Sequence, residues 1–282
     1  MSRLDTVQWG ADRLRVSPWR GDHDIAYVAP APGEPPRPEA LAQCLHTLQQ
    51  AGYSSVLTSA LNPLEQQPFL AQAFSVHEHL HLLRHDLEGD LADPGGPAPA
   101  FAQGPAPATS RPTMRRGRRR DRAAVLRVDH LAFDPFWRFD QSGLEDARRA
   151  TPTSRFRVTV VGHAVVGYAV TGRAGPVSYL QRLAVDPEHQ RHGIARSLVL
   201  DALRWARRRG AMSMLVNTQE QNDGALALYR SLGFVLEAQG LDVLERRLER
   251  DDHAGAGDLP DADPGRPGAD PGLVDPDRGR SA

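Results

Sequence analysis

The chain of 282 residues contains no lysine and only one cysteine, and its formal net charge at pH 7 is −1. The absence of lysine leaves arginine to carry the positive charge, a bias of composition that points to no particular function. A single cysteine, Cys44, excludes an internal disulfide and fits a reducing compartment. Cys44 stands among apolar residues in a helical pattern, where a small buried hydrophobic residue is expected. A net charge near zero excludes a molecule-wide field that would draw the protein to nucleic acid or to an anionic membrane.

Long apolar runs are absent as well. No segment approaches the ~20 apolar residues that a membrane-spanning helix needs. The amino terminus is polar and is interrupted by Gly10 and Pro18, so it lacks the apolar core of a signal peptide. We therefore expect a soluble cytoplasmic protein that does not bind membranes.

Proline and glycine are concentrated in residues 92–112 and again from Gly255 onward. Neither stretch has the apolar periodicity that would offset the entropy of ordering it. The sequence thus predicts four parts. They are a first ordered piece (1–92), a linker (93–112), a second ordered piece (113–250) and a disordered tail (251–282).

The second piece has the patterns of a mixed α/β domain. A helix is expected to start at Asp121, as its amino-terminal cap, and to end near Asp134-Pro135. The aromatic segment that follows, which includes Trp137, is expected either to floor a pocket or to fill the core, and Trp137 itself is more typical of a core residue. The remaining expected elements are a hairpin (156–161 and 164–171), a strand (178–185), a helix from Gly193 to Gly210, a strand (212–217), a helix (225–232) and a closing hairpin from Phe234. The fold class is mixed α/β, with a largely antiparallel sheet flanked by helices.

Gln190-Arg-His-Gly-Ile-Ala195 stands between a predicted strand and the first turn of a predicted helix. Amide groups in that first turn have no partners within the helix, and the helix dipole adds a partial positive charge, so a diphosphate is stabilised there. Gly193 allows the backbone to approach a phosphate oxygen closely. The segment therefore predicts an anion-binding loop.

Leu183-Ala-Val-Asp-Pro187 followed by Gln190-x-x-Gly193-x-Ala195 resembles the acyl-CoA signature of the GNAT superfamily of N-acetyltransferases. Further along the chain, Asn217-Thr-Gln219, Asn222, Ala225, Tyr229 and Leu232-Gly-Phe234 resemble the later motif of that superfamily. The resemblance covers roughly residues 114–248. It implies the GNAT fold and acetyl-CoA as cosubstrate.

The resemblance also implies roles for individual residues. Tyr229 would donate a proton to the leaving thiolate, and Asn222 would bond the pantetheine arm. The strand residues Leu183, Ala184 and Val185 would pair with the same arm, and Gln190, Arg191, His192, Gly193, Ile194 and Ala195 would hold the diphosphate. No metal is required.

Each of these residues has a plainer interpretation. Tyr229 fits the apolar stripe of its helix, and Asn222 fits a helix cap, which is compatible with a second role. Glu220 is a candidate general base because it follows a strand beside the cleft, but a solvated turn residue is the favoured interpretation, with water taking the proton. A backbone amide of the strand would stabilise the charge that develops on the carbonyl oxygen.

Two other patterns suggest sites and are better explained without them. Residues 115–122 are rich in arginine but lack interleaved aromatics and lead directly into a helix, so nucleic-acid binding is not expected. His77, His79 and His81 share one face of a strand, but no cysteine completes a metal site, so solvated side chains are the favoured interpretation.

The first piece repeats part of the second. Asn62, Phe69 and Phe74 have the spacing of Asn222, Tyr229 and Phe234. Phe69 stands in place of the tyrosine, and the proline-rich residues 33–38 stand in place of the diphosphate loop, where prolines lack amide donors. We therefore expect a degenerate, non-catalytic GNAT-like half that binds no acyl-CoA and packs against the catalytic part.

The sequence thus predicts an acyltransferase that moves an acetyl group from acetyl-CoA to a primary amine. The acceptor is either a peptide amino terminus or a small molecule, and Phe133-Asp-Pro-Phe-Trp137 slightly favours the peptide through a faint resemblance to enzymes that acetylate protein amino termini. Alternatives are a non-catalytic acyl-CoA sensor and an acetyltransferase similar to mycothiol synthase, which also has one inactive half. No oligomeric state is indicated.

Overall fold

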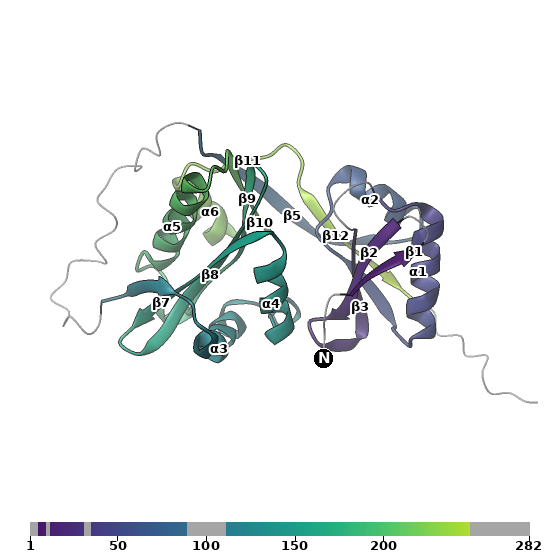
Figure 1. The fold of residues 1–282 in the computed structure, drawn as a ribbon, viewed down its shortest axis with the longest axis horizontal. Helices are drawn as coiled ribbons and strands as arrows, with labels where there is room; N and C mark the ends of the chain where they lie inside the picture. Colours follow the sequence, from purple (N-terminus) through teal and green to yellow (C-terminus); the bar gives the residue numbers. More distant parts are fainter. Residues whose placement is uncertain (1–4, 10–11, 31–34, 89–110, 249–282) are drawn as a thin grey trace, which may run out of the picture. The chain divides into compact units, whose positions relative to one another are not determined.

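Alternating and helical patterns of apolar residues produce a single large sheet with helices packed on it. A computed structural model describes residues 5–9, 12–30, 35–88 and 111–248 (Figure 1). We call residues 5–88 the amino-terminal half and residues 111–248 the carboxy-terminal half, and both belong to one compact unit. The predicted tail lies outside the described residues, as does the predicted linker up to residue 110.

The amino-terminal half contains five strands and two helices among its described residues. These are β1 (Asp5–Trp9), β2 (Asp12–Trp19), β3 (Asp22–Pro30), α1 (Pro38–Gln50), β4 (Ser55–Thr58), α2 (Pro63–Leu70) and β5 (Ser75–Asp86). The carboxy-terminal half follows with β6 (Thr113–Arg116), α3 (Arg122–Ala132), α4 (Gln141–Arg149), β7 (Thr153–Val161), β8 (Ala164–Ala174), β9 (Val177–Val185), α5 (Ile194–Arg208), β10 (Ser213–Gln219), α6 (Asp223–Ser231), β11 (Val235–Leu236) and β12 (Leu241–Arg247).

The strands form a sheet in the order β1-β2-β3-β4-β12-β5-β10-β9-β8-β7-β6, with β11 beside β5. Two neighbouring pairs, β3–β4 and β9–β10, are parallel, and the other pairs of this sheet are antiparallel. The predicted fold class is therefore confirmed. The hairpin of β7 and β8 turns at Gly162, where φ is 58°.

The helix that follows β9 forms where its pattern predicts. Ile194, Leu198, Leu203 and Ala206 of α5 are all buried against the sheet. The helix ends before Gly210, which has a φ of 74°, a left-handed conformation that favours glycine. None of the helices among the described residues is long and apolar enough to span a membrane.

The two halves exchange strands, which the sequence did not predict. The carboxy-terminal part of β5 pairs with β10 in Leu80↔Gln219 to Asp86↔Ser213 register, while β12 pairs with both β4 and the start of β5. The expected closing hairpin is wrong, because β11 and β12 each pair with β5. Twelve residues make β5 long enough to serve both halves, so it takes the place beside β10. Figure 1 shows β5 and β12 between the two groups of helices.

Asp121 precedes α3 as expected but does not cap it. Its carboxylate accepts hydrogen bonds from the Arg118 amide (2.7 Å) and from the Arg115 guanidinium, and no side-chain bond caps α3. These two donors already occupy the carboxylate. They hold its pKa down at about 2, with the Arg115 hydrogen bond the largest cause.

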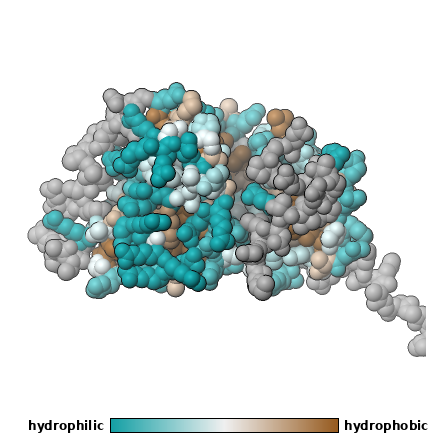
Figure 2. Space-filling model, viewed as in Figure 1, coloured by the Kyte–Doolittle hydropathy of each residue, from teal (hydrophilic) through white to brown (hydrophobic). Residues whose placement is uncertain are grey.

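Apolar clusters lie under the helices of each half and include residues from the other half, and a further cluster joins both halves. The cluster of the amino-terminal half lies under α1 and α2 and includes Cys44, which is fully buried as expected; burial raises the pKa of its thiol to about 12. Other clusters lie under α5 and α6 and under α3 and α4. On the face shown in Figure 2, most of the coloured surface of the carboxy-terminal half is hydrophilic.

Candidate active site

A cavity of about 870 Å³ is lined by residues from both halves. The carboxy-terminal half contributes β9, the start of α5, the end of β10, α6 and the segment between α3 and α4. The amino-terminal half contributes one wall from β2, β3 and the residues that follow β4. The cavity therefore exists only because the halves are joined in one unit.

The strands β9 and β10 part where they reach the cavity. Their parallel register covers only Val177–Tyr179 against Ser213–Leu215, and the residues beyond it on both strands line the cavity. The Asp186 amide donates to Val166 of β8, at 2.9 Å. Because alternate residues of an antiparallel strand bond to the same neighbour, the amides of Leu183 and Val185 point away from β8, towards the opening.

Gly193 marks the start of α5 at the other end of this opening. It has φ 76° and ψ 5°, and no side chain caps the helix, so the amides of the first turn have no intrahelical acceptor. Arg191 also has a positive φ, of 64°, which bends the loop sharply before the helix. Gln190 fastens the loop to the strand through a 3.3 Å bond from Nε2 to the Val185 carbonyl.

The structure brings most of the predicted site residues to one cavity. Two of them lie elsewhere: His192 is exposed, with Nδ1 2.7 Å from the Gln190 carbonyl, and Glu220 is exposed in the turn after β10. Glu220 therefore lies outside the cavity lining, and its role as a general base stays a prediction. The predicted residues that line the cavity are Leu183, Ala184, Val185, Gln190, Arg191, Gly193, Ile194, Ala195, Asn222 and Tyr229.

Tyr229 lies on α6 and serves both as a core residue and as part of the cavity lining. It is 4% exposed, and its ring packs against Phe234 at a centroid distance of 5.4 Å. Burial raises the pKa of its phenol, so the hydroxyl keeps its proton at neutral pH, as a proton donor must. Asn222 likewise combines two positions, because it lines the cavity and caps α6 through a 3.0 Å bond from the Ala225 amide.

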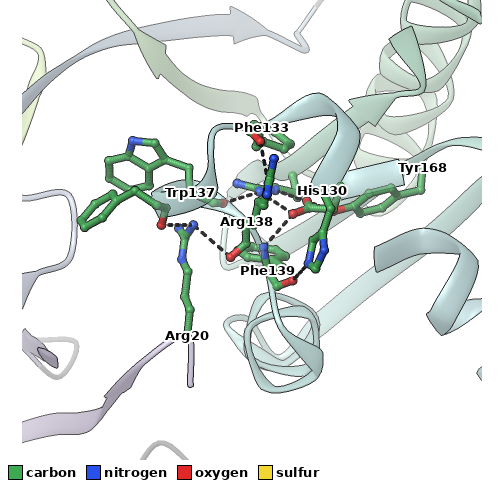
Figure 3. Close-up of polar contacts among 10 residues, drawn as sticks. Arg20, His130, Phe133, Trp137, Arg138, Phe139 and Tyr168 are labelled. Atoms are coloured by element: carbon green, nitrogen blue, oxygen red, sulfur yellow. Dashed lines mark hydrogen bonds and ion pairs between the residues drawn. The ribbon is translucent and has the colours of Figure 1, made fainter. Parts of the chain in front are cut away.

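A buried ion pair, which the sequence analysis missed, supports β9 beside the opening. Asp129 of α3 is fully buried and accepts two bonds from Arg182, at 2.8 and 2.9 Å. It also accepts bonds from the Tyr168 hydroxyl and the Phe139 amide (Figure 3). The sequence did contain a signal for this pair, because each element has a charged residue on its apolar face. Asp129 stands beside Val128, and Arg182 stands between Leu180 and Ala184.

The aromatic segment after α3 both lines the cavity and packs against neighbouring side chains. Phe133, Trp137 and Phe139 line the cavity, and the Arg182 guanidinium lies 3.4 Å from the Phe133 ring centroid and 4.0 Å from that of Phe139. Arg182 also donates a 2.6 Å bond to the Trp137 carbonyl. Trp137 is thus partly buried and faces the cavity, rather than being a core residue alone.

We call the part of this wall that lies around β2 and β3 the amino-terminal wall; it includes Arg15, Ser17, Trp19, Arg20 and Tyr27. Arg20 Nη1 donates to the carbonyls of Phe136 (3.2 Å) and Arg138 (3.4 Å), so it joins this wall to the aromatic segment (Figure 3). Burial, and then the charge of Arg182, lower the pKa of Arg20 to about 9. None of these residues was singled out by the sequence.

Among the described residues of the amino-terminal half there is no counterpart of the opening between β9 and β10. Its parallel pair, β3 and β4, stays in register along the whole of β4, from Ile25↔Ser55 to Val28↔Thr58. Phe69 is fully buried where the other half has Tyr229. Residues 33 and 34 of the proline-rich loop lie outside the described residues.

Two of the histidines and two of the arginines that suggested other sites have local partners. His77 Nδ1 lies 2.9 Å from Glu245, and His79 Nδ1 lies 2.7 Å from Asp242. In the part of the chain that the structure describes, no group of three or more His, Cys, Asp or Glu residues could hold a metal ion. In the arginine run, Arg115 pairs with Asp121 and Arg122 with Glu145.

Comparison with known proteins identifies the carboxy-terminal half. The model of the "Acetyltransferase (GNAT) family" matches residues 125–234. A mycothiol acetyltransferase of Thermobispora bispora is 36% identical over 109 residues, which are 39% of this chain and 35% of that protein. The N-alpha-acetyltransferase RimI of Mycobacterium tuberculosis is 40% identical over 89 residues, which are 30% of this chain and 54% of that protein. The chain thus spans only about a third to a half of these relatives.

The fold of both halves is shared with solved structures. A tandem GNAT protein from the clavulanic acid biosynthesis pathway matches with a TM-score of 0.59 at 16% identity, over 90% of this chain and 83% of that one. A GNAT-family protein of Novosphingobium aromaticivorans matches with a TM-score of 0.55 at 18% identity, over 86% and 92%. The amino-terminal half therefore has the fold of a GNAT-like half, and the carboxy-terminal domain, at residues 125–234, belongs to the acetyltransferase (GNAT) family.

Proposed function

We propose that this protein transfers an acetyl group from acetyl-CoA to a primary amine. One arrangement carries the proposal: the parted strands β9 and β10, the uncapped start of α5 and the buried Tyr229 all face the same cavity. Relatives that share the carboxy-terminal domain are named mycothiol acetyltransferase, N-alpha-acetyltransferase RimI and ribosomal protein bS18-alanine N-acetyltransferase, and these names support acetyl transfer.

The residues present fit acetyl-CoA. The amides of Leu183 and Val185, which β8 leaves unpaired, suit an extended pantetheine arm that adds to the strand edge. The first-turn amides after Gly193 suit the diphosphate, because they are donors at the positive end of the helix dipole. When bound, acetyl-CoA supplies a thioester, an acetyl group already activated for transfer.

In the proposed reaction, the neutral amine nitrogen attacks the thioester carbonyl, a C–N bond forms and the C–S bond breaks. One outward-facing amide of this strand edge would stabilise negative charge on the carbonyl oxygen, and the other remains for the pantetheine arm. Tyr229 gives its proton to the departing sulfur, and the amine's proton passes to water, which later restores the phenol. Glu220 is not needed, in agreement with its position outside the cavity lining.

Gly193→Glu tests the cofactor site. The new side chain would strain a backbone with φ 76° and place a carboxylate where the diphosphate binds, so the Kd for acetyl-CoA should rise about 30-fold, which corresponds to about 2 kcal/mol. Isothermal titration calorimetry measures it. Gly175→Glu is the matched control, because Gly175 also has a positive φ, of 56°, and no atom within 4 Å of an added Cβ. Equal affinities in a folded Gly193→Glu protein and the control would contradict the site.

The continuous pairing of β3 with β4 leads to a second prediction, on the number of acetyl-CoA molecules bound per chain. The full chain should bind one acetyl-CoA molecule, because β4 leaves no free strand edge and Phe69 has no hydroxyl. Calorimetric titration gives the stoichiometry directly. A value of two per chain, with the second site surviving in Gly193→Glu, would show that the amino-terminal half is not degenerate in binding.

A further inference from the structure

The amino-terminal wall owes its character to strand alternation. Leu14 and Val16 of β2 point into the apolar cluster under α1 and α2, so Arg15, Ser17 and Trp19 point to the opposite face, which lines the cavity. Ser17 pairs with Tyr27 of β3, which places the tyrosine on the same face. A half that has lost the features of a cofactor site thus presents arginines and aromatic rings to the cavity of the other half.

Arg20 is a partly buried cation that forms no ion pair with any described residue. Its guanidinium donates to neutral carbonyls and lies 4.1 to 5.3 Å from three aromatic ring centroids. The nearby carboxylates of Asp129 and Asp140 already accept bonds, from Arg182 and from the Gly143 amide. Burying a charge without a counter-ion is costly, and such groups are normally paired. The lowered pKa of Arg20 agrees with this cost.

The same wall has more donors than acceptors. Trp19 is 9% exposed, and its Nε1 is buried without a hydrogen-bond partner among the described residues. Arg15 Nε is likewise buried without a hydrogen-bond partner among the described residues. A cavity occupant with negatively charged oxygen atoms would match the excess of donors and cations on this side.

Carboxylates are scarce around the cavity. Asp146 of α4 is the one acidic residue that lines it in the described part of the chain. Burial and then Asp140 raise the pKa of Asp146, while Arg149 and Arg15 act in the opposite direction. With Arg182 neutralised by Asp129, the wall opposite the parted strands keeps two arginines against one carboxylate.

Building on the proposed acetyl transfer, we propose that the acceptor is a small amine that also carries a carboxylate, bound by Arg20 with Arg15 beside it. The rings of Trp19, Tyr27 and Trp137 line the space around these arginines and suit an aromatic or otherwise flat apolar body. The chemical class is that of an aromatic amino acid. The amine of such a molecule would point across the cavity, to the opening between β9 and β10.

Matched acceptors test the charge requirement. Free-thiol release from acetyl-CoA is measured with L-phenylalanine and L-tryptophan, and with phenylalaninamide and tryptophanamide, which keep the amine and the ring but lose the charge. We expect kcat/KM to be about 10- to 100-fold higher for the acids, as for hydrogen bonds to a charged group. The same four compounds are titrated into the CoA-bound protein, so that binding is read without turnover. Amides that bind and react as well as the acids, or acids that do neither, would overturn the inference.

Variants of Arg20 assign the effect to this wall. Arg20→Met keeps the aliphatic stem and should raise KM for the acids about tenfold or more, with the amides and acetyl-CoA unaffected, whereas Arg20→Lys should retain part of the preference. Arg138→Met is the matched control, because Arg138 is in the facing segment but outside the lining. If a folded Arg20→Met protein kept the same preference for the acids over the amides, the assignment of the carboxylate site to Arg20 would be wrong. If the wild-type protein did not bind acetyl-CoA, this result would instead contradict the proposed function itself.

Discussion

Replacing Tyr229 with phenylalanine should lower kcat about 10²- to 10⁴-fold and leave the Kd for acetyl-CoA nearly unchanged. Loss of one general acid typically has an effect of this size. The hydroxyl is the only group removed, and the ring contact with Phe234 at 5.4 Å is kept. Because burial raises the pKa of the phenol, the wild-type group is protonated throughout the neutral range and is ready to donate.

The experiment compares free-thiol release and acetyl-CoA binding in the same preparations. Tyr53→Phe is the control, because Tyr53 packs against the cluster under α1 and α2 and does not line the cavity. Full activity in Tyr229→Phe would show that Tyr229 is a core aromatic residue and not the proton donor. Tight cofactor binding by the wild-type protein, without turnover of any amine, would instead support the acyl-CoA sensor.

Asp129→Ala should destabilise the protein by about 3–5 kcal/mol, the usual cost of removing one partner from a buried ion pair. The change leaves the Arg182 guanidinium, whose side chain is 10% exposed, without its carboxylate. It also removes the acceptor of the Phe139 amide and the Tyr168 hydroxyl. Urea unfolding at neutral pH gives the free energy of unfolding.

Asp201→Ala provides the comparison. Asp201 also accepts two bonds from one arginine, Arg155, but the side chains are 16% and 25% exposed, so a loss nearer 1 kcal/mol is expected. The double variant Asp129→Leu with Arg182→Met should recover much of the loss, because no buried charge remains. A loss in Asp129→Ala no larger than in Asp201→Ala would show that the pair is not a main support of β9.

The parts of the site that depend on local sequence were predictable. The loop from Gln190 to Ala195 combines a strand end, a glycine and a helix start within a few residues, and the structure places Gly193 where the left-handed conformation is needed. The apolar stripe of α5 likewise identifies its buried face without knowledge of its partners. Signals of this kind are contained in neighbouring residues, and so one sequence is sufficient to find them.

The parts that depend on distant pairing were not predictable. Nothing in the pattern of β5 indicates that it pairs with β10 and β12, more than a hundred residues away, and its alternating histidines suggested a metal site instead. The amino-terminal wall was missed for the same reason. Arg20 and Trp137 meet only because the two halves close around one cavity.

The exchange of strands has a consequence for the order in which this protein is made. The edge of β4 and the first part of β5 pair with β12 (Leu241–Arg247), which follows β5 by more than a hundred residues. During synthesis on the ribosome, the first half must therefore wait with an incomplete sheet while more than a hundred further residues are added. Folding of the two halves therefore finishes together, when β12 inserts between β4 and β5.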